Sequence, residues 1–205
     1  MDALRSCRAW IFDMDGTLTV PVHDFDSMRR ELGLPAGLGT LEAIAALPEP
    51  ERTRRRRRLD EIGWEYALVA RPQAGALRLL ERLEARGVAL GLVTRNARAN
   101  TEETLRRIGC DGFFRPRMIL SRDDGPAKPS PEPILRVLEE SGVPPEEAVV
   151  VGDAHYDVLA GRAAGARTVL LDPSGDSPHR PLADHCVVGL DELLPWAADP
   201  SVPQV

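Results

Sequence analysis

Residues 9–19 read Ala-Trp-Ile-Phe-Asp-Met-Asp-Gly-Thr-Leu-Thr, an apolar run that ends in two aspartates and a glycine. A short apolar run followed by an acidic, glycine-containing turn predicts a buried strand that opens into a functional loop. Asp13 and Asp15 would repel each other there without a cation, and carboxylate oxygens suit Mg²⁺. Gly16 permits a tight turn in which backbone N–H groups approach an anion. The alternative is an aspartate-rich turn that only joins a strand to a helix.

The chain beyond Arg71 alternates apolar strands with helices. Further strands are expected at Val88–Val93, Met118–Leu120, Ala148–Val151, Arg167–Leu171 and Cys186–Val188. Helices are expected around Leu77–Leu83, Thr101–Ile108, Pro133–Glu140, Tyr156–Ala164 and Leu190–Trp196, with a loose tail at Asp199–Val205. Helices that alternate with fully apolar strands predict a mostly parallel sheet covered on both faces, which is a Rossmann-like α/β core.

Residues 24–70 have a different character, because their apolar residues recur at helical spacing and no apolar strand interrupts them. We expect a small α-helical cap at residues 21–70, inserted after the first strand of a core formed by residues 1–20 and 71–205. The Arg54–Arg58 run is interpreted as a solvated helix face, and contact of one or two arginines with an anionic substrate is the alternative. Trp64 and Tyr66 are expected to pack inside the cap rather than to line a pocket.

The composition bounds the function classes. Of the 205 residues, 43% are hydrophobic and 28% are charged, which is typical of a globular protein. No apolar run is long enough to span a membrane and the first residues lack a signal-peptide core, so a cytoplasmic protein is expected. Cys7, Cys110 and Cys186 are too scattered to suggest disulfides or zinc. A net charge of −6 argues against nucleic-acid binding.

Three more loops carry polar side chains where ligands bind in a parallel sheet, at or near the carboxyl ends of strands. Thr94 and Asn96 follow the second strand, and Asn96 could alternatively cap the next helix. Lys128, the single lysine of the chain, lies in Pro-Ala-Lys-Pro-Ser-Pro at residues 126–131. Asp153 and Asp157 follow the strand at residues 148–151.

These four segments resemble, in order, the motifs of the haloacid dehalogenase (HAD) superfamily. The resemblance is to subfamily I members with a small C1-type cap, such as phosphoglycolate phosphatase and beta-phosphoglucomutase. It implies that Asp13 is the nucleophile that accepts phosphate and that Asp15 is the general acid and base. It therefore implies an Mg²⁺-dependent phosphatase that hydrolyses a small phosphomonoester through an aspartyl-phosphate.

The same resemblance assigns the remaining polar groups. Gly16, Thr94, Asn96 and Lys128 would bind the transferring phosphoryl group, and Lys128 would also offset the charge of Asp13. Asp153 would bind Mg²⁺ together with Asp13 and the backbone carbonyl of Asp15. Asp157 would hold a metal-bound water or Lys128. His155 is left outside the catalytic set, as a polar residue in the first turn of a helix.

Other chemistries of the superfamily are less compatible with this chain. Dehalogenases do not keep the acid/base Asp15, the cap has no lysine for a phosphonatase Schiff base, and P-type pumps need membrane spans. A phosphomutase that uses the same aspartyl-phosphate stays open, although a small cap favours attack by water. A catalytically silent binding or regulatory protein is the other alternative. The expected partner is a small phosphomonoester, and the expected assembly is a monomer or homodimer.

Overall fold

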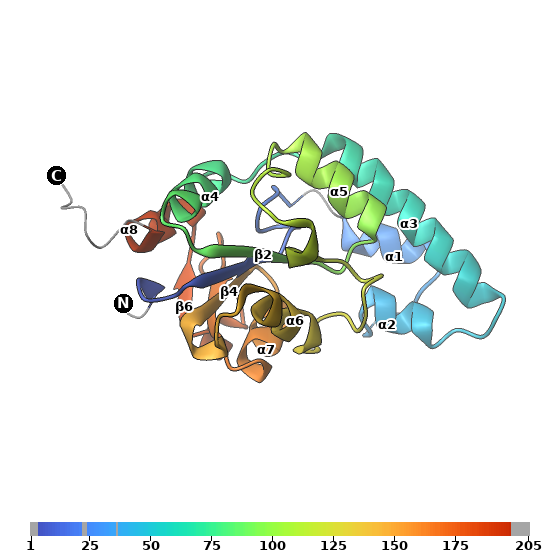
Figure 1. Ribbon diagram of the computed structural model, residues 1–205. Helices are drawn as coiled ribbons and strands as arrows, with labels where there is room; N and C mark the ends of the chain where they lie inside the picture. Colours follow the sequence, from blue (N-terminus) through green and yellow to red (C-terminus); the bar gives the residue numbers. More distant parts are fainter. Residues whose placement is uncertain (1–3, 22–23, 36, 198–205) are drawn as a thin grey trace.

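A single parallel β-sheet forms the centre of the molecule (Figure 1). The computed structural model describes residues 4–21, 24–35 and 37–197. Within them the strand order is β3-β2-β1-β4-β5-β6. The strands are β1 Ala9–Phe12, β2 Ala89–Val93, β3 Ile119–Leu120, β4 Ala148–Gly152, β5 Arg167–Leu171 and β6 His185–Val187. The predicted α/β fold is confirmed, and every expected strand is present with its ends shifted by at most one residue.

Helices cover both faces of this sheet, as the alternating sequence pattern predicts. The helices of the core are α4 Ala76–Ala85, α5 Arg98–Arg107, α6 Glu132–Ser141, α7 His155–Ala163 and α8 Leu194–Ala197. Short 3-10 turns are found at Pro116–Met118, Pro145–Glu147, Arg180–Leu182 and Leu190–Leu193. The expected helix at Leu190–Trp196 is thus a 3-10 turn that continues into α8. The tail expected at Asp199–Val205 lies outside the described residues.

Strand β1 contributes side chains to the apolar clusters on both faces of the sheet. Successive side chains of a strand point to opposite faces. Trp10 and Phe12 pack in the cluster that contains residues of α4, α5 and α8. Ala9 and Ile11 pack in the cluster on the other face, with residues of α6 and α7. Both faces of β1 are fully buried, which explains why its sequence is apolar without alternation.

Three helices lie between β1 and α4, at one end of the core (Figure 1). They are α1 Phe25–Glu31, α2 Thr40–Ala45 and α3 Glu51–Val69. They share a small apolar cluster of Met28, Leu32, Ile44, Leu59 and Ile62. We propose, on this basis, that residues 21–70 form a cap on a core of residues 1–20 and 71–205.

The expectation that Trp64 packs inside the cap is wrong. Trp64 is 42% exposed, whereas Tyr66 packs against the apolar cluster of the cap. The buried stripe of α3 contains Leu59 and Ile62. Trp64 follows Ile62 by two positions, which is about 200° around a helix, so it faces solvent.

The arginine run on α3 is paired with acidic side chains. Arg54 contacts Glu51 and Arg57 contacts Glu61, and these two arginines are 68% and 84% exposed. Arg56 instead reaches across to Asp123 of the core. Arg54 and Arg57 therefore match the solvated helix face, and Arg56 joins the cap to the core. Among the helices of the described ranges, none has the length and apolar character that a membrane span requires.

Candidate active site

The sheet brings together side chains from loops that are far apart in sequence. Strands β1 and β4 are neighbours, and chain order reverses between them, which is where open α/β sheets bind ligands. Asp13 follows β1, Thr94 follows β2 and Asp153 follows β4. Because the strands are parallel, these three positions lie at the same edge of the sheet. Lys128 reaches this edge from the loop before α6.

Lys128 is the buried cation of the site. Its side chain is 2% exposed, and its Nζ lies 2.6 Å from Asp13 Oδ1 and 2.6 Å from Asp157 Oδ1. It also donates to the carbonyl oxygen of Val93 at 2.6 Å. An ammonium group has three protons, and three oxygen acceptors surround this one. Burial disfavours its charge, but the carboxylates of Asp13 and Asp157 outweigh burial and raise the pKa of Lys128.

Carboxylates outnumber cations at this edge of the sheet. Oxygen atoms of Asp13, Asp153 and Asp157 all lie within 4.8 Å of one another. Burial raises the pKa of Asp153 to about 8, and the charges of Asp13 and Asp157 add to the effect. Burial likewise raises the pKa of Asp13 to about 7, although Lys128 opposes it. One ammonium leaves this cluster with excess negative charge, so its oxygen donors fit a divalent cation such as Mg²⁺.

Asp15 lies beside this cluster and has a different partner. The side-chain amide of Asn96 donates to Asp15 Oδ2. Burial raises the pKa of Asp15 to about 6, against the opposing effect of the Asn96 hydrogen bond. A carboxyl group with such a pKa can both give and take a proton near neutral pH.

The alternative role of Asn96 as a helix cap is therefore not realised. Helix α5 has Ala97 at its N-cap, and the backbone N–H of Arg98 donates to Asp123 Oδ2 at 2.8 Å. Asp123 satisfies an N–H group that Asn96 would have capped. This leaves the Asn96 amide to bind Asp15, a residue 81 positions away in sequence.

Thr94 and Gly16 complete the loops around the carboxylates. Thr94 is buried, and its Oγ1 accepts a hydrogen bond from the backbone N–H of Asn96 at 3.2 Å. The hydroxyl proton can then point to another acceptor. Gly16 has a φ of +80°, and a Cβ atom there would lie 2.1 Å from Asp153 Oδ2. The loop needs glycine both for its backbone conformation and for the approach of Asp153.

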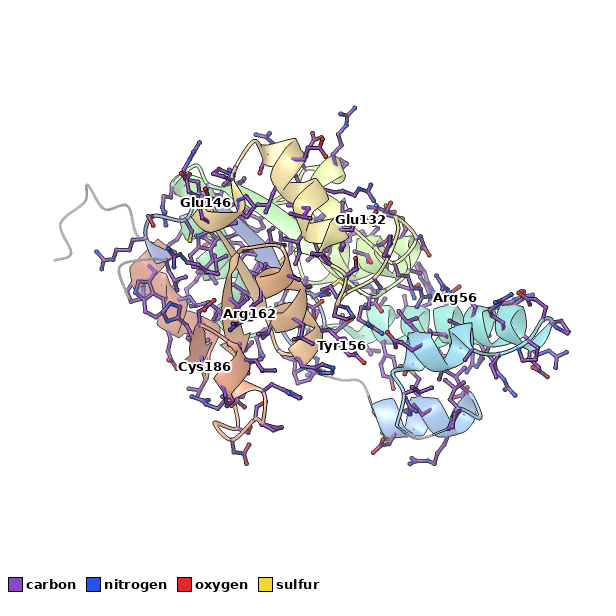
Figure 2. The ribbon with its side chains drawn as sticks, turned by 90° about the horizontal axis from the view of Figure 1, so that it is seen from below. Arg56, Glu132, Glu146, Tyr156, Arg162 and Cys186 are labelled. Carbon is purple, nitrogen blue, oxygen red and sulfur yellow. The ribbon has the colours of Figure 1, made fainter. Side chains whose placement is uncertain are left out.

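Sequence reasoning missed Arg95, Glu42 and Tyr156. The guanidinium of Arg95 lies 4.1 Å from the centre of the Tyr156 ring and 2.8 Å from Glu42 of the cap. Figure 2 shows Tyr156 on the side of the core that faces the cap. The signal in the sequence was the position of Arg95 between Thr94 and Asn96. His155 packs its ring against Tyr156 and His179, at centroid distances of 3.9 and 4.8 Å.

Comparison with known proteins places the chain in one family. A family model described as a haloacid dehalogenase-like hydrolase matches residues 7–165. An uncharacterized hydrolase of Saccharomyces cerevisiae is 31% identical, over 95% of this chain and 92% of its own length. A phosphoglycolate phosphatase of Pseudomonas syringae pv. tomato is 31% identical, over 92% of this chain and 79% of its own. An N-acetylmuramic acid 6-phosphate phosphatase of Pseudomonas aeruginosa is also 31% identical, over 80% and 81%.

Solved structures share the fold. A hydrolase from Pseudomonas syringae superposes with a TM-score of 0.78 at 24% identity, over 92% of this chain and 96% of that one. A structure described as a putative beta-phosphoglucomutase from Thermotoga maritima superposes with a TM-score of 0.68 at 26% identity, over 92% and 97%. These similarities extend over the cap as well as the sheet.

Proposed function

This chain belongs to the haloacid dehalogenase-like hydrolases, and from that premise we propose that it is an Mg²⁺-dependent phosphatase of small phosphomonoesters. In this proposal Asp13 carries the phosphoryl group as an aspartyl-phosphate. The observation that carries it is the geometry at Lys128, whose Nζ lies 2.6 Å from Asp13 Oδ1 inside a cluster of three carboxylates. A mostly buried carboxylate that a cation holds at a strand end is arranged for attack on an anionic substrate.

The first half-reaction transfers the phosphoryl group to the protein. A carboxylate oxygen of Asp13 attacks phosphorus as the bond between phosphorus and the leaving oxygen breaks. Asp15 in its protonated form gives its proton to that oxygen, and the pKa of about 6 allows this. Lys128, Thr94 and the backbone at Gly16 would bind the phosphoryl oxygens.

The second half-reaction returns Asp13 to its starting state. The carboxylate of Asp15 takes a proton from water, the water oxygen attacks phosphorus, and the bond to Asp13 breaks as inorganic phosphate forms. Asp13 and Asp153 would hold Mg²⁺, with the backbone carbonyl of Asp15 as a further predicted ligand. Mg²⁺ bound there would supply positive charge against the phosphoryl oxygens. Asp157 would keep Lys128 in place in both half-reactions.

Hydrolysis of p-nitrophenyl phosphate tests the proposal. We expect Mg²⁺-dependent release of phosphate, its loss in EDTA, and no turnover by Asp13→Asn. Asp15→Asn should lower the rate by roughly 10²–10⁴-fold, which is the usual contribution of a general acid and base. Protein quenched in acid during turnover should carry covalently bound phosphate that hydroxylamine releases. Asp13→Asn should carry none. Undiminished turnover in EDTA or by Asp13→Asn would refute the mechanism.

A phosphomutase would share the first half-reaction and differ in the acceptor. The structural similarity to the putative beta-phosphoglucomutase makes this a distinct candidate. Hexose phosphates and small acidic phosphomonoesters, including phosphoglycolate and N-acetylmuramic acid 6-phosphate, should be compared as substrates. Our proposal expects inorganic phosphate as the product, and a rearranged sugar phosphate without phosphate release would favour the mutase. Sedimentation of the same protein would test the proposed monomer or homodimer.

A further inference from the structure

Arg95 links the cap to the loop that carries Lys128. It follows Thr94 in the loop after β2, and its side chain is 20% exposed. The guanidinium stacks over the Tyr156 ring at 4.1 Å, which restricts its position from the α7 side. Its two amino groups then point to different parts of the chain, one to the cap and one to the core.

The contact with the cap is made by Glu42 in the first turn of α2. Arg95 Nη2 donates to Glu42 Oε1 at 2.8 Å and to Oε2 at 2.9 Å. The backbone before α2 lies close to the same place, because a Cβ at Gly39 would lie 2.7 Å from the Tyr156 hydroxyl. The start of α2 therefore contacts both Arg95 and Tyr156.

The contact with the core is made with the main chain of Lys128. Arg95 Nη1 donates to the carbonyl oxygen of Lys128. The side chain of that same residue approaches Asp13 and Asp157 at 2.6 Å. A continuous series of contacts thus runs from Glu42 through Arg95 to Lys128 and on to Asp13.

We propose that Arg95 is a positioning residue that couples the placement of α2 to the placement of Lys128. Glu42 orients the guanidinium, and the guanidinium fixes the main chain from which the Lys128 ammonium reaches Asp13. An exposed ion pair adds little to stability, so the pair matters for geometry rather than for folding. Geometry is sensitive here, because a shift of about 1 Å in a reacting group can lower a rate by about 10²-fold. The effect on catalysis rests on the proposed function, whereas the coupling itself does not.

A second ion pair between cap and core provides the matched control. Arg56 of α3 lies 3.3 Å from Asp123, and both side chains are about as exposed as Glu42, at 44% and 45% against 42%. Within the part of the chain that the structure describes, Arg56 pairs with Asp123 and with no residue of the proposed catalytic set. Arg56→Gln removes a cap-to-core charge contact without touching the Arg95 series.

The single lysine of the chain makes the coupling directly observable. In protein labelled with ¹⁵N-lysine, Lys128 gives the only side-chain ammonium signal. We expect this signal to shift or broaden in Glu42→Gln and in Arg95→Gln, and to stay unchanged in Arg56→Gln. An unchanged signal in Glu42→Gln and Arg95→Gln would overturn the proposal, and so would an equal change in all three variants. This measurement needs no turnover.

Steady-state kinetics test the consequence for catalysis. Glu42→Gln and Arg95→Gln should each lower kcat for p-nitrophenyl phosphate by roughly ten-fold, with little change in KM. The double variant should be no slower than Arg95→Gln, because Glu42 acts on Lys128 only through Arg95. Arg95→Lys should not restore kcat, since one ammonium cannot replace the stacked, forked guanidinium. Full rescue by Arg95→Lys, or additive losses, would overturn the positioning role. A native chain without phosphatase activity would refute the proposed function, while the Lys128 signal would still decide the coupling.

Discussion

The raised pKa of Asp153 makes the stability of the protein depend on pH. Burial and the charges of Asp13 and Asp157 raise this pKa to about 8, whereas an aspartate in an unfolded chain has a pKa of about 3.9. A group whose pKa is raised by folding stabilises the protein below its unfolded pKa, and this contribution disappears as pH rises through the folded pKa. Without metal, the free energy of unfolding should therefore fall as pH rises towards 8.

Bound Mg²⁺ should offset this fall in the free energy of unfolding, since it binds the ionised carboxylates of the folded protein and not the unfolded chain. We expect Mg²⁺ to raise the melting temperature more at alkaline pH than at acidic pH. Thermal unfolding across pH, in EDTA and in Mg²⁺, measures it. Asp153→Asn is the control, because it should flatten the pH dependence and abolish most of the Mg²⁺ effect. A Mg²⁺ shift of the same size at every pH would contradict the assignment.

Gly16 gives a second prediction at the scale of one residue. Gly16→Ala would place a Cβ atom 2.1 Å from Asp153 Oδ2 at a φ of +80°, so Asp153 has to move. We expect Mg²⁺ affinity and turnover to fall strongly while the sheet stays folded. A Mg²⁺ titration followed by activity and by melting temperature measures both effects.

Gly175→Ala is the matched control for this change. Its φ is +78°, and a Cβ there would meet no atom within 4 Å. Both variants have the backbone strain of roughly 1 kcal/mol that alanine suffers at positive φ. Only Gly16→Ala should lose Mg²⁺ affinity, and equal losses in both would show that backbone strain, not contact with Asp153, is responsible.

At the scale of elements, the contact between α3 and α5 determines how the cap meets the core. The two helices lie side by side (Figure 1), and a Cβ at Gly63 of α3 would lie 2.3 Å from Asn100 Nδ2 of α5. Alanine normally stabilises a helix interior by about 1 kcal/mol relative to glycine. Here Gly63→Ala should instead lower the free energy of unfolding, because the added methyl group separates the helices.

Urea unfolding of four proteins tests this prediction: the native chain, Gly63→Ala, Asn100→Ala and the double variant. Asn100→Ala removes the amide that the new methyl group would meet, although it also removes a hydrogen bond of 3.1 Å to Asp60 O. We therefore expect Gly63→Ala to cost less stability in the Asn100→Ala background than in the native chain. A native chain that gains stability from Gly63→Ala would mean that the helices separate without cost.

The elements of the core could be predicted from the sequence because they obey local rules. Strands buried on both faces are continuous apolar runs, as at residues 148–151, and the glycine that ends a helix has a positive φ, as at Gly87. The carboxyl ends of parallel strands share one edge, so Asp13, Thr94 and Asp153 could be expected to meet there. That edge is where the structure brings them.

The contacts that sequence reasoning missed depend on partners distant in the chain. Asn96 binds Asp15 rather than capping α5, because Asp123 satisfies the helix start. Arg95 could not be assigned from sequence, since its partner Glu42 lies in the cap and nothing local indicates that pairing. Burial of Trp64 was expected because aromatic residues are usually buried. Its position about 200° around α3 from the buried Ile62 turns it to solvent instead.

At the scale of the whole molecule, contacts distributed along the cap join it to the core. Gly63 packs against Asn100, the Asn100 amide donates to the carbonyl oxygen of Asp60 at 3.1 Å, and the buried Arg122 pairs with the Asp60 carboxylate. An apolar cluster as small as that of the cap would support little independent stability. We therefore expect the described cap and core to unfold together in one cooperative transition.

Tryptophan fluorescence can follow the cap separately from the sheet. Trp64 lies on α3 of the cap and is 42% exposed. The chain has three tryptophans, so Trp64 would be the one that remains in a Trp10→Phe/Trp196→Phe variant. Its urea midpoint should coincide with that of far-UV circular dichroism measured on the same variant, which allows for any stability lost at Trp10. Adding Gly63→Ala should separate the two midpoints, with Trp64 changing at lower urea, because that substitution loosens the contact between α3 and α5. Separate midpoints before Gly63→Ala is added would mean that the cap and the core do not unfold in one cooperative transition.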